Sequence, residues 1–342
     1  GLASPGAGAV ASWGAGLAPT HDFNRSWPAQ LGFSLLLTAF GFRIVQALQD
    51  ISIYPFTLGW SETSRYYYAS LFFAEKLYSL DIPPTVLHPS RYLMQAVPFL
   101  LPNSPLWLHR AWQVFLWIGT TLLTSWMLLR RLAIASQWNR ALFFITSFLF
   151  LLIGPVYYHL QVPVILILWG FRNSPADRPW LRFSRSLIVV VAASAWAGIS
   201  RVNWYPLPGL LATCIYLLEE HVLAAKAPDR RITLRSIVLY LAKPAAWTIM
   251  GMAVALSANT LYIRWSGNPA EQFTTSFSSA LLWYRLLPSS TYPPGILPGA
   301  LITSLPFLYL IWNRLNKLTN WRQFHPLRLL GLVAVLLVFF TG

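Results

Sequence analysis

The feature that most constrains the fold is a series of apolar runs that recur from about residue 31 to the end of the sequence, many of them approaching the length of a membrane-spanning helix. The core of a bilayer, about 30 Å thick, needs about 20 helical residues. Within lipid, only helices and closed barrels satisfy the hydrogen bonds of the backbone. The runs do not alternate apolar and polar residues as barrel strands do. The sequence therefore predicts an all-α polytopic membrane protein.

The charge content agrees with this fold class. Charged residues make up 10% of the chain, whereas soluble domains carry about 25%. The formal net charge of +15 would indicate nucleic acid as a partner of a soluble protein. Here the basic residues fall in short connections between apolar runs, which is the distribution of the positive-inside rule. We therefore expect membrane lipid, and no nucleic acid, as a partner.

We expect about nine transmembrane helices, with the amino terminus and the basic loops cytoplasmic, in what we predict to be a bacterial inner (plasma) membrane. Several of the runs, above all the fourth to the sixth, are short for a span. The predicted spans lie near residues 31–49, 108–129, 141–158, 160–172, 186–200, 205–219, 236–260, 296–313 and 327–341.

The expected domain organisation is a flexible cytoplasmic tail over residues 1–30 and one transmembrane domain over residues 31–342, with further spans expected after residue 342. Two long connections, 50–107 and 261–295, then lie outside the cytoplasm. The first contains two predicted helices, near 62–80 and 90–100, whose aromatic residues suit the membrane interface. Neither the single cysteine, Cys214, nor any Cys/His spacing predicts a metal site.

The segment GWSETSRYYYASLFF (59–73) places an acid, a base and a tyrosine cluster directly after the first apolar run. Ser61-Glu62 is followed there by Tyr66-Tyr67-Tyr68-Ala69. This order resembles the GT-C superfamily of polyprenyl-phosphate-dependent glycosyltransferases, especially its protein-mannosyltransferase and aminoarabinose-transferase-like branch. The same loop in that branch reads Asp-Glu and then Tyr-Tyr with a small residue. Glu62 matches the glutamate, and Ser61 stands in place of the aspartate.

The resemblance implies an inverting sugar transfer on the extracytoplasmic face, with a polyprenyl-phosphate sugar as donor. Such a reaction needs a carboxylate that takes the proton of the acceptor and cations that stabilise the departing phosphate. Glu62, held without a salt partner and facing a cavity, is the expected base, and Asp50 is the second candidate. No cofactor is expected, although divalent ions occur in some branches. The expected substrate-binding residues are Arg65, Tyr66, Tyr67, His88, Arg91, Arg201, Asn203, Arg264 and Arg285.

Structural roles for these residues stay open at this point. Glu62 in the first turn of a helix complements the helix dipole, Asp50 suits a helix end, and Arg201 suits snorkelling to the headgroups. His159, at an external turn, has no second axial partner for a haem. The alternative function is a non-catalytic GT-C-shaped membrane subunit or scaffold of a larger complex, which the serine at position 61 favours. Whether the chain forms oligomers is open.

Overall fold

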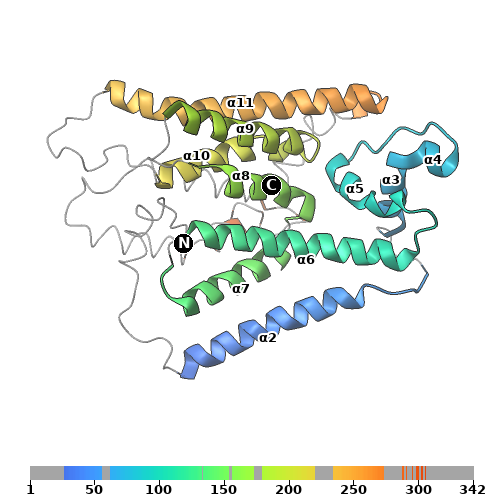
Figure 1. Ribbon diagram of the computed structural model, residues 1–342, viewed down its shortest axis with the longest axis horizontal. Coiled ribbons are helices and arrows are strands. Elements are labelled where there is room, and N and C mark those ends of the chain that lie inside the picture. Colours follow the sequence, from blue (N-terminus) through green and yellow to red (C-terminus); the bar gives the residue numbers. More distant parts are fainter. Residues whose placement is uncertain are drawn as a thin grey trace.

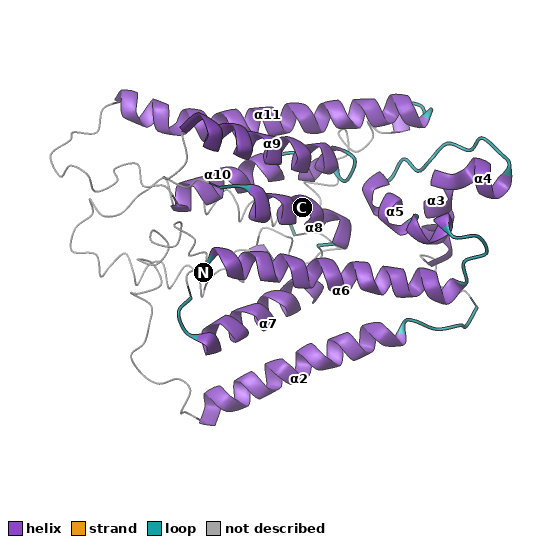
Figure 2. Cartoon of the chain, viewed as in Figure 1, coloured by secondary structure: helices purple, strands orange, loops and turns teal. Residues whose placement is uncertain are grey.

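The structure is a computed structural model of the chain. It describes residues 27–55, 62–132, 134–153, 156–172, 179–219 and 234–272, together with a few isolated positions between 287 and 305. All regular structure in this part of the chain is helical, as the apolar runs predict (Figures 1 and 2). The long helices are α2 (Trp27–Gln49), α6 (Leu106–Arg131), α7 (Gln137–Ile153), α8 (Tyr158–Gly170), α9 (Pro179–Gly198), α10 (Leu207–Glu219) and α11 (Leu234–Ser266).

Three helical segments are long and apolar enough to cross a membrane: α2, α6 and the Leu241–Ser266 part of α11. The other apolar helices are shorter than a full span: α7, α8 and the Phe183–Gly198 part of α9. The seven expected spans up to residue 260 each coincide with one helix, although α11 continues to Ser266, into the second predicted loop. The last two expected spans lie almost entirely outside the described residues. The full number of nine spans therefore stays a prediction.

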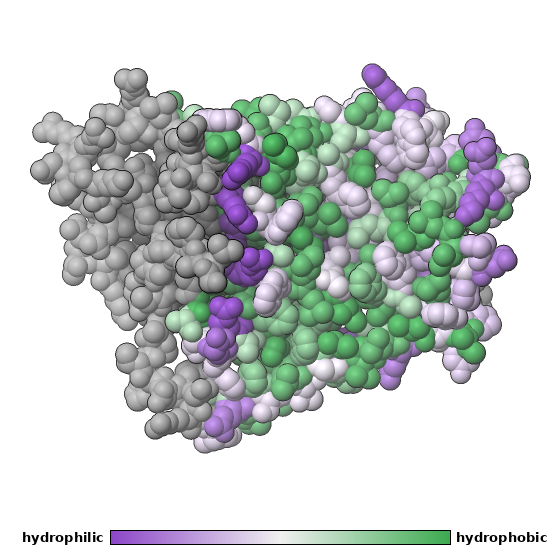
Figure 3. Space-filling view, in the orientation of Figure 1, coloured by the Kyte–Doolittle hydropathy of each residue, from purple (hydrophilic) through white to green (hydrophobic). Residues whose placement is uncertain are grey.

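The long helices lie side by side as one bundle, and α3 (Glu62–Ser70), α4 (Ala74–Tyr78) and α5 (Pro89–Gln95) gather at one end of it (Figure 1). Hydrophobic residues cover the middle of the visible face, whereas hydrophilic residues gather toward both ends (Figure 3). This banded surface is typical of a protein that crosses a bilayer. The bundle is therefore that of an all-helical membrane protein.

The main core lies where α8, α9, α10 and α11 meet. Trp247 of α11 is buried there, with its ring centroid 4.9 Å from that of Phe171 and 5.3 Å from that of Tyr216. The backbones of α9 and α11 approach closely at Gly198, where an added Cβ would collide with the carbonyl of Ala255. Small residues that allow such approach are the usual basis of helix packing in lipid.

Arg131 is the last residue of α6, at the end away from the α3–α5 unit, and it hydrogen-bonds to the end of α8. Its guanidinium donates to the carbonyl of Leu168 at 2.8 Å and also to the carbonyl of Phe171. These carbonyls lie at the end of α8, where the helix leaves them without backbone donors. The arginine satisfies them and fixes the two helix ends together.

Helix α2 packs on the edge of the bundle and contains no buried residue. It contacts α7 mainly through aromatic pairs, with the Phe33 and Trp138 ring centroids 4.0 Å apart and those of Phe40 and Phe148 4.7 Å apart. Most of its other apolar side chains are exposed, as suits a helix that faces lipid. Its carboxyl end, however, leads directly into the candidate site.

The α3–α5 unit contains both helical stretches expected in the first loop. The first stretch consists of α3, a 3₁₀ turn at Leu71–Phe73 and α4, and the second consists of α5 and a 3₁₀ turn at Val97–Leu100. Ala69, Tyr92 and Ala96 form the small core between them. The position of this unit at the membrane interface stays a prediction.

Candidate functional site

A cavity of about 730 Å³ lies where the end of α2, the start of α3, and helices α6 and α7 meet. Both candidate carboxylates, Asp50 and Glu62, line it together with Arg65 and Tyr66. The first apolar run and the tyrosine segment, adjacent in sequence, therefore contribute to the same space. The remaining lining residues include Arg43, Gln46, Ser52, Arg110 and Gln113 on the polar side, and Val114, Trp117, Leu152 and Ile153 on the apolar side.

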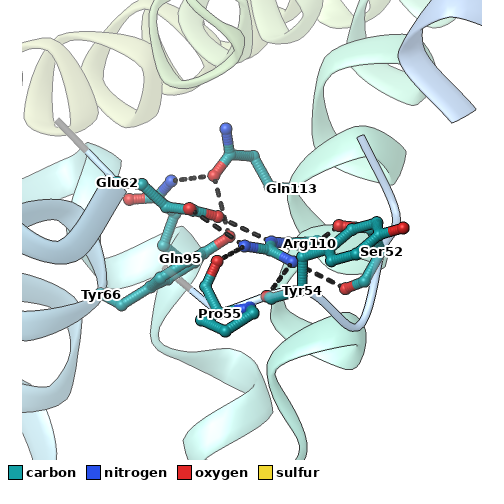
Figure 4. Close-up of polar contacts among 8 residues, drawn as sticks. All are labelled: Ser52, Tyr54, Pro55, Glu62, Tyr66, Gln95, Arg110 and Gln113. Atoms are coloured by element: carbon teal, nitrogen blue, oxygen red, sulfur yellow. Dashed lines mark hydrogen bonds and ion pairs between the residues drawn. The ribbon is translucent and has the colours of Figure 1, made fainter. Parts of the chain in front are cut away.

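Glu62 is ion-paired with Arg110 (Figure 4). The guanidinium donates from Nε to Oε1 at 2.7 Å and from Nη2 to Oε2 at 3.1 Å, which is a bidentate pair. The side chain of Arg110 is 6% exposed and that of Glu62 is 20% exposed. The expectation that Glu62 lacks a salt partner is therefore wrong, whereas the expectation of a cavity beside it is confirmed.

Arg110 also binds the chain that follows α2. Its Nη1 donates to the carbonyls of Ser52 and Tyr54, each at 2.8 Å, and its Nη2 lies 3.4 Å from the carbonyl of Pro55. We call this arrangement of Arg110, Glu62, Ser52, Tyr54 and Pro55 the Arg110 clasp. It joins the exit of α2, the first turn of α3 and the first turns of α6, so it sets the shape of the polar end of the cavity.

Tyr66 lies one helical turn after Glu62, on the same face of α3. Its hydroxyl lies 3.5 Å from Oε1 of Gln113, an oxygen that also accepts a hydrogen bond from Nε2 of Gln95 at 3.3 Å (Figure 4). Burial, followed by the neighbouring Glu62 carboxylate, raises the pKa of the Tyr66 phenol to about 12. The phenol is therefore neutral at physiological pH, and its hydroxyl is the donor in the contact with Gln113.

Asp50 follows the last residue of α2 and lies within electrostatic range of Tyr66 and Arg110. Its backbone amide donates to the carbonyl of Ala47 at 3.2 Å, as in a helix end. Within the described residues its carboxylate makes no hydrogen bond or ion pair, whereas Glu62 is held by two. Of the two carboxylates in the cavity, Asp50 is thus the one less engaged by the protein.

Three other candidates form a second cluster, which also contains His159. The guanidinium carbons of Arg91 and Arg201 lie 4.9 Å and 5.5 Å from the centroid of the Tyr157 ring. The rings of His88 and His159 are 6.1 Å apart, centroid to centroid. Arg91 and His88 come from the α5 region and Arg201 from the turn after α9, so the fold joins what the sequence separates by more than 100 residues.

Trp117 contacts both the cavity and the second cluster. It lines the cavity, and its ring centroid lies 5.3 Å from that of Tyr157. The side chains of the remaining candidates, Tyr67, Asn203 and Arg264, are exposed and do not line the cavity. Arg285 and the serine at position 61 lie outside the described residues.

Sequence reasoning missed Arg43 and Arg110 as site residues. Arg43 is the one charged residue within the predicted first span, and an intramembrane charge is a signal of function by default. Its Nη1 donates to Oε1 of Gln46 at 2.8 Å. Arg110 carried a weaker signal, because it lies at the start of the predicted span 108–129, where an arginine snorkels to the headgroups. Its partner Glu62 lies 48 positions earlier in the chain.

No group of three or more metal-ligating side chains occurs in the part of the chain that the structure describes. A divalent ion, as it occurs in some branches of the GT-C superfamily, therefore has no complete ligand set among those residues. Asp50 and Glu62 together supply two carboxylates, and Arg110 already occupies one of them.

Fold and site together define an all-helical membrane protein with a charged cavity at one end of its bundle. The chain matches no known protein-family model, no curated protein and no solved structure.

Proposed function

We propose that this protein is a membrane glycosyltransferase that transfers a sugar from a polyprenyl-phosphate donor to an acceptor on the extracytoplasmic face. The observation that carries the proposal is the cavity, which collects Asp50, Glu62, Arg65 and Tyr66 at one end of a membrane bundle. These are four of the residues that the resemblance to GT-C transferases singles out. A volume of about 730 Å³ is within the usual range of ligand pockets.

The two sides of the cavity suit an amphiphilic donor. Asp50, Glu62, Arg43 and Arg65 supply charges on one side. Leucine, isoleucine, valine and tryptophan side chains of α6 and α7 supply an apolar wall on the other. A prenyl-linked phosphate has the same division, with an anionic group joined to a hydrocarbon chain. The charge pattern therefore supports a lipid phosphate rather than a free sugar nucleotide as the donor.

In this proposal, the oxygen of the acceptor attacks the anomeric carbon while the bond from that carbon to the phosphate oxygen breaks. The proton of the acceptor passes to a carboxylate, and the lipid phosphate leaves as a monoester. Asp50 is the base that the geometry favours, because Glu62 is paired with Arg110. Arg65 and Arg43 stabilise the charge on the departing phosphate.

The test is transfer from a radiolabelled polyprenyl-phosphate sugar by the purified full chain in detergent or nanodiscs. Asp50→Asn is expected to lower kcat by about 100-fold or more, because a general base contributes about 10²–10⁴-fold. Glu62→Gln is expected to lower it less. Lys76→Gln, an exposed cation of α4 outside the cavity, serves as the matched control. Undiminished turnover in Asp50→Asn would remove Asp50 as the base, and undiminished turnover in both carboxylate variants would remove a carboxylate of this cavity as the base. Absence of transfer by the native chain, with the donor bound or unbound, would refute the proposal.

The second candidate function is a non-catalytic membrane subunit of a larger assembly. The Arg110 clasp favours it, since a glutamate that is bidentate with a buried arginine serves well as a structural tie. Copurification of the native chain in a stable complex, with no transfer activity and no binding of the lipid-linked donor, would support this function. Turnover by the purified chain alone would exclude it.

A further inference from the structure

One face of α6 borders the cavity along two helical turns. Arg110, Gln113, Val114 and Trp117 all line it. They occupy positions i, i+3, i+4 and i+7, which lie on one side of a helix. The proposed transfer reaction uses the carboxylates and arginines around this face, but it assigns no role to Gln113 or Trp117. These two residues place a neutral amide and an aromatic ring one turn apart.

The amide of Gln113 is held by its oxygen. This Oε1 lies 3.5 Å from the hydroxyl of Tyr66 and accepts a hydrogen bond from Nε2 of Gln95 at 3.3 Å. Nε2 of Gln113 therefore points away from both neighbours, as Figure 4 shows. Within the described residues it donates to no protein acceptor, so its two N–H groups are left for a ligand in the cavity that Gln113 lines.

Gln95 keeps the Gln113 amide in this orientation. The Gln95 side chain is 2% exposed, and among the described residues its Oε1 is enclosed without a donor. Reversal of both amides would instead enclose the amino group of Gln95 without an acceptor. Enclosed N–H groups without partners are rarer in proteins than enclosed carbonyl oxygens. The amino group of Gln113 is therefore the end of the pair that is presented to a ligand.

Trp117 supplies an aromatic surface one turn further along α6. Its ring centroid lies 5.3 Å from that of Tyr157 and 5.5 Å from that of Tyr158, the second in an edge contact at 82°. Because Tyr158 is fully buried, the core fixes the orientation of the indole. An indole offers a large, rigid apolar face. Such a face suits the C–H side of a sugar ring, whose hydroxyl groups project from its rim.

The charges at this end of the cavity favour a neutral ligand. Burial, and then the Glu62 carboxylate, raise the pKa of the Tyr66 phenol, and Glu62 acts on it more strongly than Arg110 or Arg65. The charge that acts most strongly on the hydroxyl beside Gln113 is thus negative, which disfavours an anion at that point. Amide N–H groups are neutral donors that suit hydroxyl oxygens, whereas arginine suits phosphate.

We infer that Gln113 and Trp117 form the subsite for the sugar of the donor, and that this sugar is neutral and bound through its hydroxyl groups. The amino group of Gln113 donates to hydroxyl oxygens, and the Trp117 indole packs on the C–H side of the ring. Gln95 is a positioning residue that orients Gln113. The inference rests on the proposed function for a lipid-linked donor, and it adds the class of sugar and the residues that select it. Arg43 and Arg65 are left to the phosphate.

The experiment measures binding, which needs no turnover. Tritiated polyprenyl phosphate is bound to the full chain in nanodiscs and displaced by unlabelled polyprenyl phosphate or by its esters with glucose, mannose, galactose, arabinose and glucuronic acid. The quantity compared is the sugar preference, defined as the ratio of the Kd for bare polyprenyl phosphate to the Kd for an ester. The matched control is Gln137→Leu, the same substitution at the exposed first residue of α7, away from the cavity.

The native chain is expected to prefer at least one neutral sugar ester by about tenfold or more. Gln113→Leu is expected to lower that preference about tenfold and to leave the Kd of bare polyprenyl phosphate unchanged, because it removes neutral hydrogen bonds to the sugar alone. Trp117→Leu and Gln95→Leu are expected to lower the preference several-fold, and Gln137→Leu to leave it unchanged. A general disruption of the fold would instead weaken both ligands alike.

Near-native circular dichroism and melting temperature qualify each variant. Gln113→Asn, which withdraws the amide by one methylene group, replaces Gln113→Leu if that variant fails to fold. Absence of a sugar preference in the native chain, tighter binding of the glucuronic acid ester than of every neutral ester, or an unchanged preference in the Gln113 variant would overturn the inference. Equal weakening of bare polyprenyl phosphate by that variant would assign the amide to the phosphate and would overturn it as well.

The same measurements separate this inference from the proposed function. A native chain that prefers a neutral sugar ester through Gln113 but transfers no sugar refutes the proposed function alone. A chain that transfers sugar, but whose sugar preference does not depend on Gln113, refutes this inference alone.

Discussion

Removal of Arg110 is the sharpest test of the site geometry. Arg110→Met keeps most of the volume and apolar contact of the side chain but deletes every donor of the clasp. Glu62 then loses two hydrogen bonds, of 2.7 Å and 3.1 Å, and the carbonyls of Ser52 and Tyr54 lose one each. Breaking a buried ion pair from one side costs about 3–5 kcal/mol. Because the Glu62 side chain is 20% exposed and water relieves part of this cost, we expect about 3 kcal/mol.

The matched variant is Glu62→Gln, which keeps the shape of the side chain and one acceptor oxygen. Its expected cost is about 1–2 kcal/mol, since it exchanges charge-assisted hydrogen bonds for neutral ones. In the double variant, most of the cost of losing the pair has already been incurred by the first substitution. The two effects are therefore expected to combine with a coupling energy of about 1 kcal/mol or more.

The assay is the free energy of unfolding in mixed micelles, measured by titration with denaturing detergent and followed by far-ultraviolet circular dichroism. Lys76→Met is the control, because Lys76 is an exposed cation on the same side of the bundle. Its ammonium donates only to the carbonyls of Phe99 and Leu100 at the surface, so its loss is expected to cost less than about 1 kcal/mol. An Arg110→Met protein as stable as this control would refute the clasp. Additivity within about 0.3 kcal/mol in the double variant would refute the direct pairing of Glu62 with Arg110.

Three further predictions concern packing and pH. Gln161→Leu removes the buried bonds from α8 to Thr121 and Thr124 of α6, and is expected to lower the free energy of unfolding by about 1–2 kcal/mol in the same assay. Gly198→Val inserts a branched side chain against the backbone of α11 and is expected to cost more than about 3 kcal/mol, or to prevent folding, as read from the yield of monodisperse protein. The lowered pKa of His88 means that the folded chain holds the neutral ring, so its stabilising contribution is present above pH 6.5 and is lost as pH falls from 6.5 toward 4. His88→Gln is expected to unfold with a shallower pH dependence across that range, and an unchanged slope would contradict the neutral state of His88 in the folded chain.

The helices were the most predictable part of this protein. The run at 31–49 became α2 (Trp27–Gln49), and the run at 108–129 became α6 (Leu106–Arg131). Both depend on local properties, namely apolar length and the absence of helix breakers, so the sequence is sufficient to find them. The two helical stretches of the first loop were predictable for the same reason. Their boundaries moved because short 3₁₀ turns divide each stretch, at Leu71–Phe73 and Val97–Leu100.

The partners within the site were much less predictable. The sequence draws attention to Glu62 through its neighbours in the chain, but Arg110 lies 48 residues later, and only the fold brings it there. The same holds for Arg91 and Arg201, which meet at Tyr157. Residue type and position in the sequence predict which side chains are able to act as bases or to bind an anion. They do not predict which of them neutralise one another, because that depends on distances set by helix packing.

The clasp also determines how the two proposed functions are to be separated. Because Glu62 has a structural role through Arg110, loss of activity in a Glu62 variant does not by itself establish chemistry at that carboxylate. Asp50 has no hydrogen bond or ion pair from its carboxylate within the described residues, so Asp50→Asn removes a charge at little structural cost. A transferase therefore predicts that Asp50→Asn loses turnover while it keeps its stability and its donor binding. A structural subunit predicts that Arg110→Met disrupts the assembly, and that Asp50→Asn has no effect at all.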